Sequence, residues 1–239
     1  MVDLYQFGQE EEMASVNASG IGKIQKVHFD PYGIRFGGCN AKGDLNIWKF
    51  DHSLSDMAAP YIFIENCHSS SITDFTFLNS PNLLASIGTN STPTLSLWDL
   101  LLPLDSSCIR SIDNLESVGV IEYCESLNIL CIGSQKGKIT RIDLRTNRVL
   151  DVTDAHATSI KSLFISGKFL YSGSRNGQVK VWDLTRMDSV DLGTHNHADA
   201  ASLLTSVTLK NFDMHLIGDG YLATTFEKTV AIWEQPFQK

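Results

Sequence analysis

Five segments of the chain end in the same short pattern. Four of them close a run of alternating apolar residues on a tryptophan, and in the remaining one an isoleucine stands in its place. The five markers are Trp48, Trp98, Ile142, Trp182 and Trp233, and they lie 50, 44, 40 and 51 residues apart. Such a recurrence indicates one structural unit repeated along the chain, since units of this size bury their apolar faces by stacking on one another.

A period of about 40 to 50 residues ending on Trp-Asp is typical of a β-propeller built from WD repeats. We therefore predict an all-β chain of about five recognisable four-stranded blades, forming a single domain over residues 1–239. The expected blades are approximately residues 17–66, 67–114, 115–154, 155–194 and 195–239, with residues 2–12 completing a blade. Because about seven blades are usual for this fold, we expect part of a longer propeller, with a small closed ring as the alternative.

Each expected blade contains a hairpin with an alternating strand ahead of it. In the fourth unit, residues 170–174 and 178–183 flank Asn176-Gly177, a strong turn signal because both residues tolerate positive φ. Outer edge strands are predicted after the markers, for example at residues 61–64 and 148–152. The expected inner strands, rich in apolar and β-branched residues, are residues 24–29, 72–77, 119–123, 160–165 and 203–209.

Composition argues against several classes of function. A net charge of −8 disfavours a nucleic-acid surface, because phosphates are bound by concentrated Lys and Arg. The five cysteines are scattered without a Cys-x-x-Cys pair, which predicts buried free thiols in a reducing compartment. The apolar run at residues 100–102 is ended by Pro103, far below the roughly 20 residues of a membrane span. We expect a cytoplasmic protein that reaches vesicle, endosome or vacuole membranes through its partners.

Some residues have the types found in a hydrolase site. His156, Ser172 and Trp182, with Asn176 nearby, are matched in the second unit by His68, Ser86 and Trp98. In WD repeats such groups form a buried hydrogen-bond network, and leaving them unpaired would cost about 1 to 3 kcal/mol each. We therefore predict structural roles for His68, Trp98, His156, Ser172, Trp182, Trp48 and Trp233.

No catalytic or metal site is predicted. His195 and His197, with Asp199 nearby, have the types of metal ligands, but two histidines on a polar loop are expected to be solvated. The chain has neither a Gly-rich phosphate loop nor a Gly-x-Ser-x-Gly motif. We expect a protein that is not an enzyme and needs no cofactor.

Basic residues recur in the turns between the second and third strands. Four of the five units carry them there, as Lys42, Lys136 with Lys138, Arg175 and Lys228. In a propeller these turns gather on one face, so they predict a binding site for an acidic segment of a partner protein. The alternative is a set of solvated turn residues, with Glu65, Asp113, Glu116 and Asp154 approaching the same face.

The order of the motifs resembles one particular family of WD-repeat proteins. His68 leads to Asp74-Phe75-Thr76-Phe77, and the long turn at residues 90–92 leads to Leu97-Trp98-Asp99. Residues 132–145 and 155–182 continue the same order of motifs along the chain. From about Val2 to Trp233, this order is similar to the C-terminal propeller of the rabconnectin-3 (DmX-like) family, and the last unit departs most.

The resemblance implies a function. Members of this family are very long scaffold proteins that promote assembly of the vacuolar-type proton ATPase. The chain is then expected to be a C-terminal piece or a shortened relative that supports organelle acidification, with subunits of the ATPase and of its assembly complex as partners. The alternatives are a generic WD-repeat adaptor or a substrate receptor of a cullin-type ubiquitin ligase. For the latter, Ile142-Asp143-Leu144-Arg145 is a near variant of the Trp-Asp-x-Arg motif.

Overall fold

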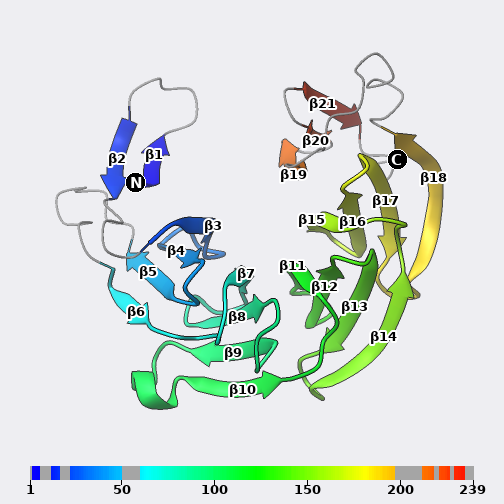
Figure 1. Cartoon of the computed structure of the whole chain (residues 1–239). Coiled ribbons are helices and arrows are strands. Elements are labelled where there is room, and N and C mark those ends of the chain that lie inside the picture. Colours follow the sequence, from blue (N-terminus) through cyan, green and yellow to red (C-terminus); the bar gives the residue numbers. More distant parts are fainter. Residues whose placement is uncertain are drawn as a thin grey trace. The chain divides into compact units, whose positions relative to one another are not determined.

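A computed structural model of the chain describes the backbone of residues 2–5, 12–16, 22–49, 60–196, 212–217, 221–226 and 229–234, and side chains within 22–49 and 60–187. These residues form antiparallel sheets, and their one helical element is the 3-10 turn η1 (Leu104–Ser106) (Figure 1). The predicted all-β class is confirmed. The chain divides into two compact units, unit 1 (Met1–Val118) and unit 2 (Gly119–Lys239).

Unit 1 contains two four-stranded sheets and a hairpin. In each sheet, strands that follow one another in the sequence are neighbours. The first sheet consists of β3 (Ile24–Phe29), β4 (Arg35–Asn40), β5 (Leu45–Lys49) and β6 (Ile62–Ile64). The second consists of β7 (Ile72–Phe77), β8 (Leu83–Gly88), β9 (Leu95–Asp99) and β10 (Cys108–Ile112). The hairpin pairs β1 (Val2–Tyr5) with β2 (Glu12–Val16).

Unit 2 repeats this arrangement. Its first sheet consists of β11 (Val118–Cys124), β12 (Ile129–Ser134), β13 (Lys138–Asp143) and β14 (Arg148–Asp154). The first residue of β11, Val118, is also the last residue of unit 1. The next consists of β15 (Ile160–Ser166), β16 (Phe169–Ser174), β17 (Gln178–Asp183) and β18 (Asp188–Asn196). A three-stranded sheet follows, formed by β19 (Phe212–Ile217), β20 (Tyr221–Phe226) and β21 (Thr229–Glu234).

The fifth repeat differs from the sequence prediction. The strand paired with β20 is β19, not residues 203–209, which lie outside the described residues. Residues 203–209 carry no charged side chain, whereas β19 includes Asp213, but turn chemistry favours β19. Gly218-Asp219-Gly220 leaves only three residues between β19 and β20, the loop length and composition of a short hairpin.

Three of the inner strands share a β-bulge near their start. The register shifts between Ile24 and Lys26 in β3, between Ile72 and Asp74 in β7, and at the equivalent place in β15. In each case the inner strand carries one extra residue, and in β15 this residue is Lys161. Because a bulge re-aims side chains, strict alternation along these strands does not predict where their polar residues point.

Neighbouring sheets pack around buried apolar side chains. In unit 1, Ile47 of β5 and Phe75 of β7 are fully buried in one cluster with Trp98. Gly37 permits this contact, because a Cβ there would lie 2.7 Å from the Phe75 ring. In unit 2, a second cluster joins the sheets β11–β14 and β15–β18, and it includes Cys131, Ile139, Ile160, Leu170 and Trp182.

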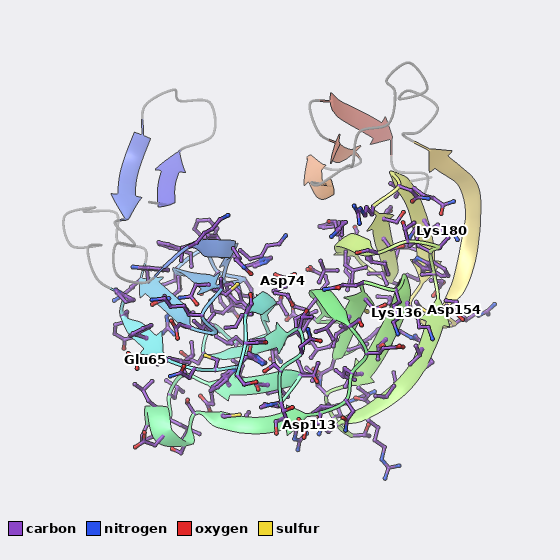
Figure 2. The ribbon with its side chains drawn as sticks, viewed as in Figure 1. Glu65, Asp74, Asp113, Lys136, Asp154 and Lys180 are labelled. Carbon is purple, nitrogen blue, oxygen red and sulfur yellow. The ribbon has the colours of Figure 1, made fainter. Side chains whose placement is uncertain are left out.

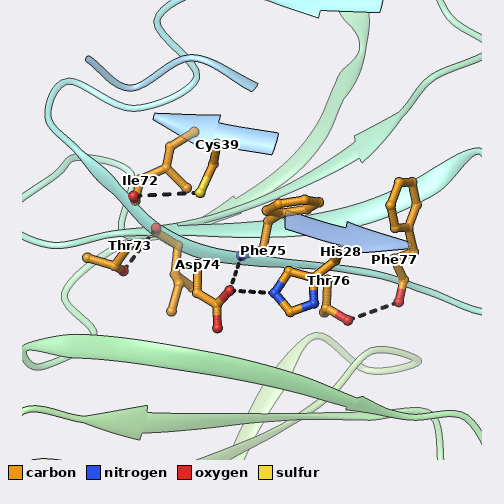
Figure 3. A network of polar contacts seen from close by, with 9 residues as sticks. His28, Cys39, Ile72, Thr73, Asp74, Phe75, Thr76 and Phe77 are labelled. Carbon is orange, nitrogen blue, oxygen red and sulfur yellow. Dashed lines mark hydrogen bonds and ion pairs between the residues drawn. The ribbon is translucent and has the colours of Figure 1, made fainter. Parts of the chain in front are cut away.

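A polar network also links the two large sheets of unit 1 (Figure 3). The Nε2 atom of His28 on β3 lies 2.9 Å from Oδ1 of Asp74 on β7, and the Phe75 backbone N–H donates to the same oxygen. The His28 ring also meets Phe75 edge to face, with ring centroids 5.1 Å apart. A polar contact and an aromatic contact therefore fix the inner strands of consecutive sheets to each other.

All five cysteines are free thiols. Cys39, Cys67, Cys124 and Cys131 are buried, as predicted. The prediction was wrong for Cys108, which is exposed. It lies on β10, the outer strand of its sheet, where one face is open to solvent.

Candidate protein-binding site

The histidine of the fourth repeat is saturated with hydrogen bonds. His156 lies in the loop between β14 and β15, and its Nε2 is 2.7 Å from Ser172 Oγ, which also accepts from Trp182 Nε1 at 2.8 Å. Its Nδ1 lies 3.2 Å from Gln178 Oε1. Asn176 is not part of this network, because its Oδ1 accepts from Ser174 instead. Burial lowers the pKa of His156 to about 4, so the ring is neutral at pH 7 and both nitrogens are engaged.

The second repeat has the same network. His68 Nε2 lies 2.8 Å from Ser86 Oγ, and Trp98 Nε1 donates to that oxygen at 2.9 Å. His68 Nδ1 is 2.9 Å from the Pro93 carbonyl oxygen, and burial lowers the His68 pKa. In both repeats the serine hydroxyl is the shared partner of the histidine and the tryptophan, and all three side chains are buried, so these groups hold one sheet together.

The first repeat lacks this network. Gly38, paired with Asn46, occupies the position that Ser86 and Ser172 hold in their sheets. Trp48 is buried and stacks on Phe36, with ring centroids 5.2 Å apart. Its indole Nε1 has no hydrogen-bond partner among the described residues. Trp233 lies on β21, and its side chain is outside the described set.

The third repeat replaces the network with a buried arginine. Ile142 stands at the marker position and is fully buried, and its neighbour Arg141 is 7% exposed. The Arg141 guanidinium binds both carboxylate oxygens of Asp151 on β14 and the carbonyl oxygen of Leu184 from the following repeat. The sequence did not reveal this contact, because one partner is a backbone oxygen 43 residues away.

The hairpin turns at Gly43 and Gly137 are each bonded to the loop that leads into the next sheet. In unit 2 the Gly137 carbonyl oxygen accepts from the N–H groups of Ala155 and His156, at 3.0 and 2.9 Å. Gly137 has φ +82°, and a Cβ there would lie 2.0 Å from the His156 oxygen. In unit 1 Gly43 contacts the His68 backbone in the same way. Glycine at these turns therefore lets turns and loops of successive sheets lie side by side.

This arrangement gathers basic side chains at one edge of unit 2. The turn between β12 and β13 carries Lys136 and leads into Lys138, and the turn between β16 and β17 carries Arg175. The Arg175 N–H donates to the Ser159 oxygen, which fixes that turn to the loop before β15. We name Lys136, Lys138, Lys161, Arg175 and Lys180 the basic edge. Figure 2 labels two of them, Lys136 and Lys180, together with Asp154.

The basic edge carries one acidic residue. The segments 134–138, 154–161 and 174–180 contain the five bases and Asp154 alone among acids. Asp154 Oδ1 lies 3.9 Å from Lys138 Nζ, and its side chain is 88% exposed, so this ion pair is weak. Lys180 is half-buried and donates from Nζ to the Ala155 oxygen at 2.6 Å. The edge is thus locally positive on a chain of net charge −8.

Three of the five basic residues predicted from sequence, Lys136, Lys138 and Arg175, lie in or beside turns of unit 2 that are hydrogen-bonded to the loop at residues 155–159. Lys42 lies exposed in the β4–β5 turn of unit 1, and Lys228 is outside the described residues. The sequence reading missed Lys161 and Lys180. Lys161 is the bulge residue of β15, and Lys180 sits on a strand from which its long side chain reaches the neighbouring loop.

The acids and histidines singled out in the sequence lie in different parts of the chain. Of the acids expected near these turns, Asp154 lies in unit 2, whereas Glu65, Asp113 and Glu116 belong to unit 1. His195 lies on β18 with its side chain undescribed, and His197 and Asp199 are outside the described residues. Within the part of the chain that is described, no three His, Cys, Asp or Glu side chains gather as metal ligands. The described helical segments include none with the length and apolar character of a membrane span.

Comparison with known proteins identifies the repeat and the fold. Residues 147–183 match the family model described as WD domain, G-beta repeat. A crystal structure of the computationally designed Ika8 protein superposes with a TM-score of 0.67 at 19% identity, covering 93% of this chain and 61% of that one. The chain contains a WD repeat and has the β-propeller fold, as predicted.

The sequence is similar to DmX-like protein 1. The mouse protein is 25% identical over 205 residues and the human protein 23% identical over 205 residues. Each match covers 82% of this chain but 7% of the relative, so the chain spans a small part of those proteins. The resemblance to DmX-like proteins that was predicted from the motifs is confirmed.

Proposed function

We propose that this chain is a protein-binding scaffold that holds an acidic segment of a partner at the basic edge. The observation that carries the proposal is the presence of five bases and one acid in three segments of a chain with net charge −8, where residues 154–161 are hydrogen-bonded to the other two segments. Lys138, Lys161 and Lys180 are half-buried, so an acidic segment would meet bases whose positions are partly fixed. Complementary charge of this kind raises the association rate and selects against basic partners.

We further propose that the partner belongs to the vacuolar-type proton ATPase or its assembly complex. The similarity to DmX-like protein 1 over 82% of the chain supports this proposal. A scaffold with this role would be found in the cytoplasm and would reach vesicle, endosome or vacuole membranes through its partners. The WD-repeat fold commonly presents binding surfaces on its loops, which also favours a scaffold over an enzyme.

The experiment is quantitative co-purification of the tagged chain from cells. We expect proton ATPase subunits to be enriched with the wild-type chain. Recovery of ubiquitin-ligase adaptors in their place would contradict the proposal and favour a substrate receptor.

A charge-reversal pair tests the surface. Lys136→Glu with Arg175→Glu should lower recovery of the partner by about tenfold or more, a change typical of losing central interface charges. The matched control, Arg148→Glu with Arg186→Glu, makes the same charge change at exposed residues of unit 2 outside the basic edge. Equal recovery by both pairs would contradict a role for the basic edge.

A further inference from the structure

The connection between β9 and β10 in unit 1 exposes a cluster of apolar side chains. Leu101 is 73% exposed, the highest value among the large apolar residues described, and Leu102, Leu104 and Ile109 are 41%, 55% and 50% exposed. We name these four residues the leucine patch. Single exposed leucines are ordinary, but grouped ones mark a surface that another molecule covers.

The backbone beneath the patch is fixed by its own hydrogen bonds. The Leu101 N–H donates to Asp99 Oδ1 at 3.0 Å, and the Asp99 N–H donates to the Ser107 oxygen at 2.8 Å. The Ser107 hydroxyl in turn donates to the Leu104 oxygen at 2.8 Å. Leu100 alone turns inward and packs against the core of unit 1. The leucines are therefore held outward by an ordered loop, which lowers the entropy cost of binding.

Ile109 joins the patch through the outer strand. The turn η1, which contains Leu104, contacts β10. The register of β10 against β9 shifts between Cys108 and Arg110, so Ile109 is the bulge residue. An extra residue at an outer strand is turned away from the regular pairing, and here that residue is an apolar one that is 50% exposed.

Two carboxylates flank three of the four patch residues. Residues 99–106, which contain Leu101, Leu102 and Leu104, carry Asp99 and Asp105 and no base, and Asp105 is exposed. Arg110 follows Ile109 on β10, and Asp113 lies beyond the far end of that strand (Figure 2). This arrangement favours an apolar ligand with flanking positive charge, and it disfavours an anionic membrane surface, whose lipids the carboxylates would repel.

We propose that the leucine patch is a docking site for a short amphipathic segment of a partner protein, with apolar side chains flanked by Lys or Arg. The inference does not depend on the basic edge, which selects the opposite charge. A scaffold with both surfaces would hold an acidic segment at one and a basic, apolar segment at the other.

The test uses a model peptide of about 14 residues, about four helical turns, patterned from Leu and Lys, with a Leu and Glu peptide as the charge control. Fluorescence anisotropy should detect binding of the Leu and Lys peptide to the full chain and weak or no binding of the other. Leu101→Ser with Leu104→Ser should weaken binding about tenfold. Val149→Ser with Val152→Ser, which alters residues 45% and 55% exposed on β14, should leave it unchanged.

Three outcomes would overturn the proposal. The first is equal binding of the peptide by both double variants. The second is a dimer of the wild-type chain in sedimentation that Leu101→Ser with Leu104→Ser dissociates, which would assign the patch to a second copy. The third is leucine-dependent binding to phosphatidylserine vesicles, which would assign it to a membrane. Folding of both variants is checked by urea unfolding, and because all four residues are exposed, we expect native stability.

Discussion

His156 is buried as a neutral ring, and this makes stability depend on pH. In the unfolded chain a histidine titrates near its ordinary pKa of about 6.5, whereas burial lowers the pKa of folded His156 to about 4. Between these values the unfolded state binds the proton first, so stability falls as the pH drops from 6.5 towards 4. Above pH 6.5 this residue adds no pH dependence.

We expect His156 to reduce the free energy of unfolding by about 2 kcal/mol between pH 7.5 and pH 5. Urea unfolding of the wild type and of His156→Gln at both pH values isolates this effect from the carboxylates, which titrate in both proteins. The difference in free energy of unfolding between the wild type and His156→Gln should be about 2 kcal/mol smaller at pH 5 than at pH 7.5. An unchanged gap would mean that the folded ring is protonated or exposed.

The cysteines should differ sharply in reactivity. Burial raises the pKa of Cys39 and of Cys67 to about 12, while Cys108 is exposed on β10. Because the thiolate is the reactive form, a disulfide reagent should modify one thiol in the native chain and the remaining four only on unfolding. Cys108→Ser should abolish the fast reaction. A second fast equivalent in the native wild type would contradict the burial of the other thiols.

At the scale of elements, the turn at Gly137 joins consecutive sheets of unit 2. An alanine there would combine a strained positive φ with a Cβ 2.0 Å from the His156 oxygen. We expect Gly137→Ala to lower the free energy of unfolding by more than 2 kcal/mol. The positive φ costs an alanine roughly 1 kcal/mol of strain, and the clash of its Cβ with the backbone adds to that cost.

Gly167 provides the control for this prediction. It also has a positive φ, of +57°, but a Cβ there would meet nothing within 4 Å. Gly167→Ala should therefore cost only the conformational strain, about 1 kcal/mol. Equal losses for the two variants, measured by urea unfolding, would show that the contact between the turn and the loop does not constrain the sheets.

Local patterns predicted most of the strands but fewer of the long-range contacts. Alternation and the Asn176-Gly177 turn signal located β16 and β17 closely, because both depend on neighbours in sequence. The strand β19 was missed because residues 203–209 form an uncharged run with β-branched residues, whereas β19 includes Asp213. The contact of Arg141 with the Leu184 oxygen, and the position of Lys180 at the basic edge, depend on packing between elements that no local pattern encodes.

At the scale of the whole molecule, charge is distributed unevenly. The net charge is −8, yet the basic edge combines Lys136, Lys161 and Arg175 with few acids. The leucine patch lies in unit 1 and is flanked by Asp99 and Asp105, so the two surfaces favour ligands of opposite charge. This distribution predicts that added salt weakens binding of the acidic partner to the basic edge. At about 0.15 M salt, screening limits interactions between exposed charges to roughly 8 Å, and more salt shortens this range further.

Site-specific photo-crosslinking shows whether an acidic segment of a partner binds at the basic edge. A crosslinking amino acid replaces Ala157, which is exposed in the loop between β14 and β15, or, as the control, Thr146, which is exposed in the turn between β13 and β14. Mass spectrometry of the products should identify an Asp- and Glu-rich segment of a proton ATPase assembly protein attached at residue 157 and absent at residue 146. Equal labelling at both positions, or a segment without acidic residues at 157, would contradict the account.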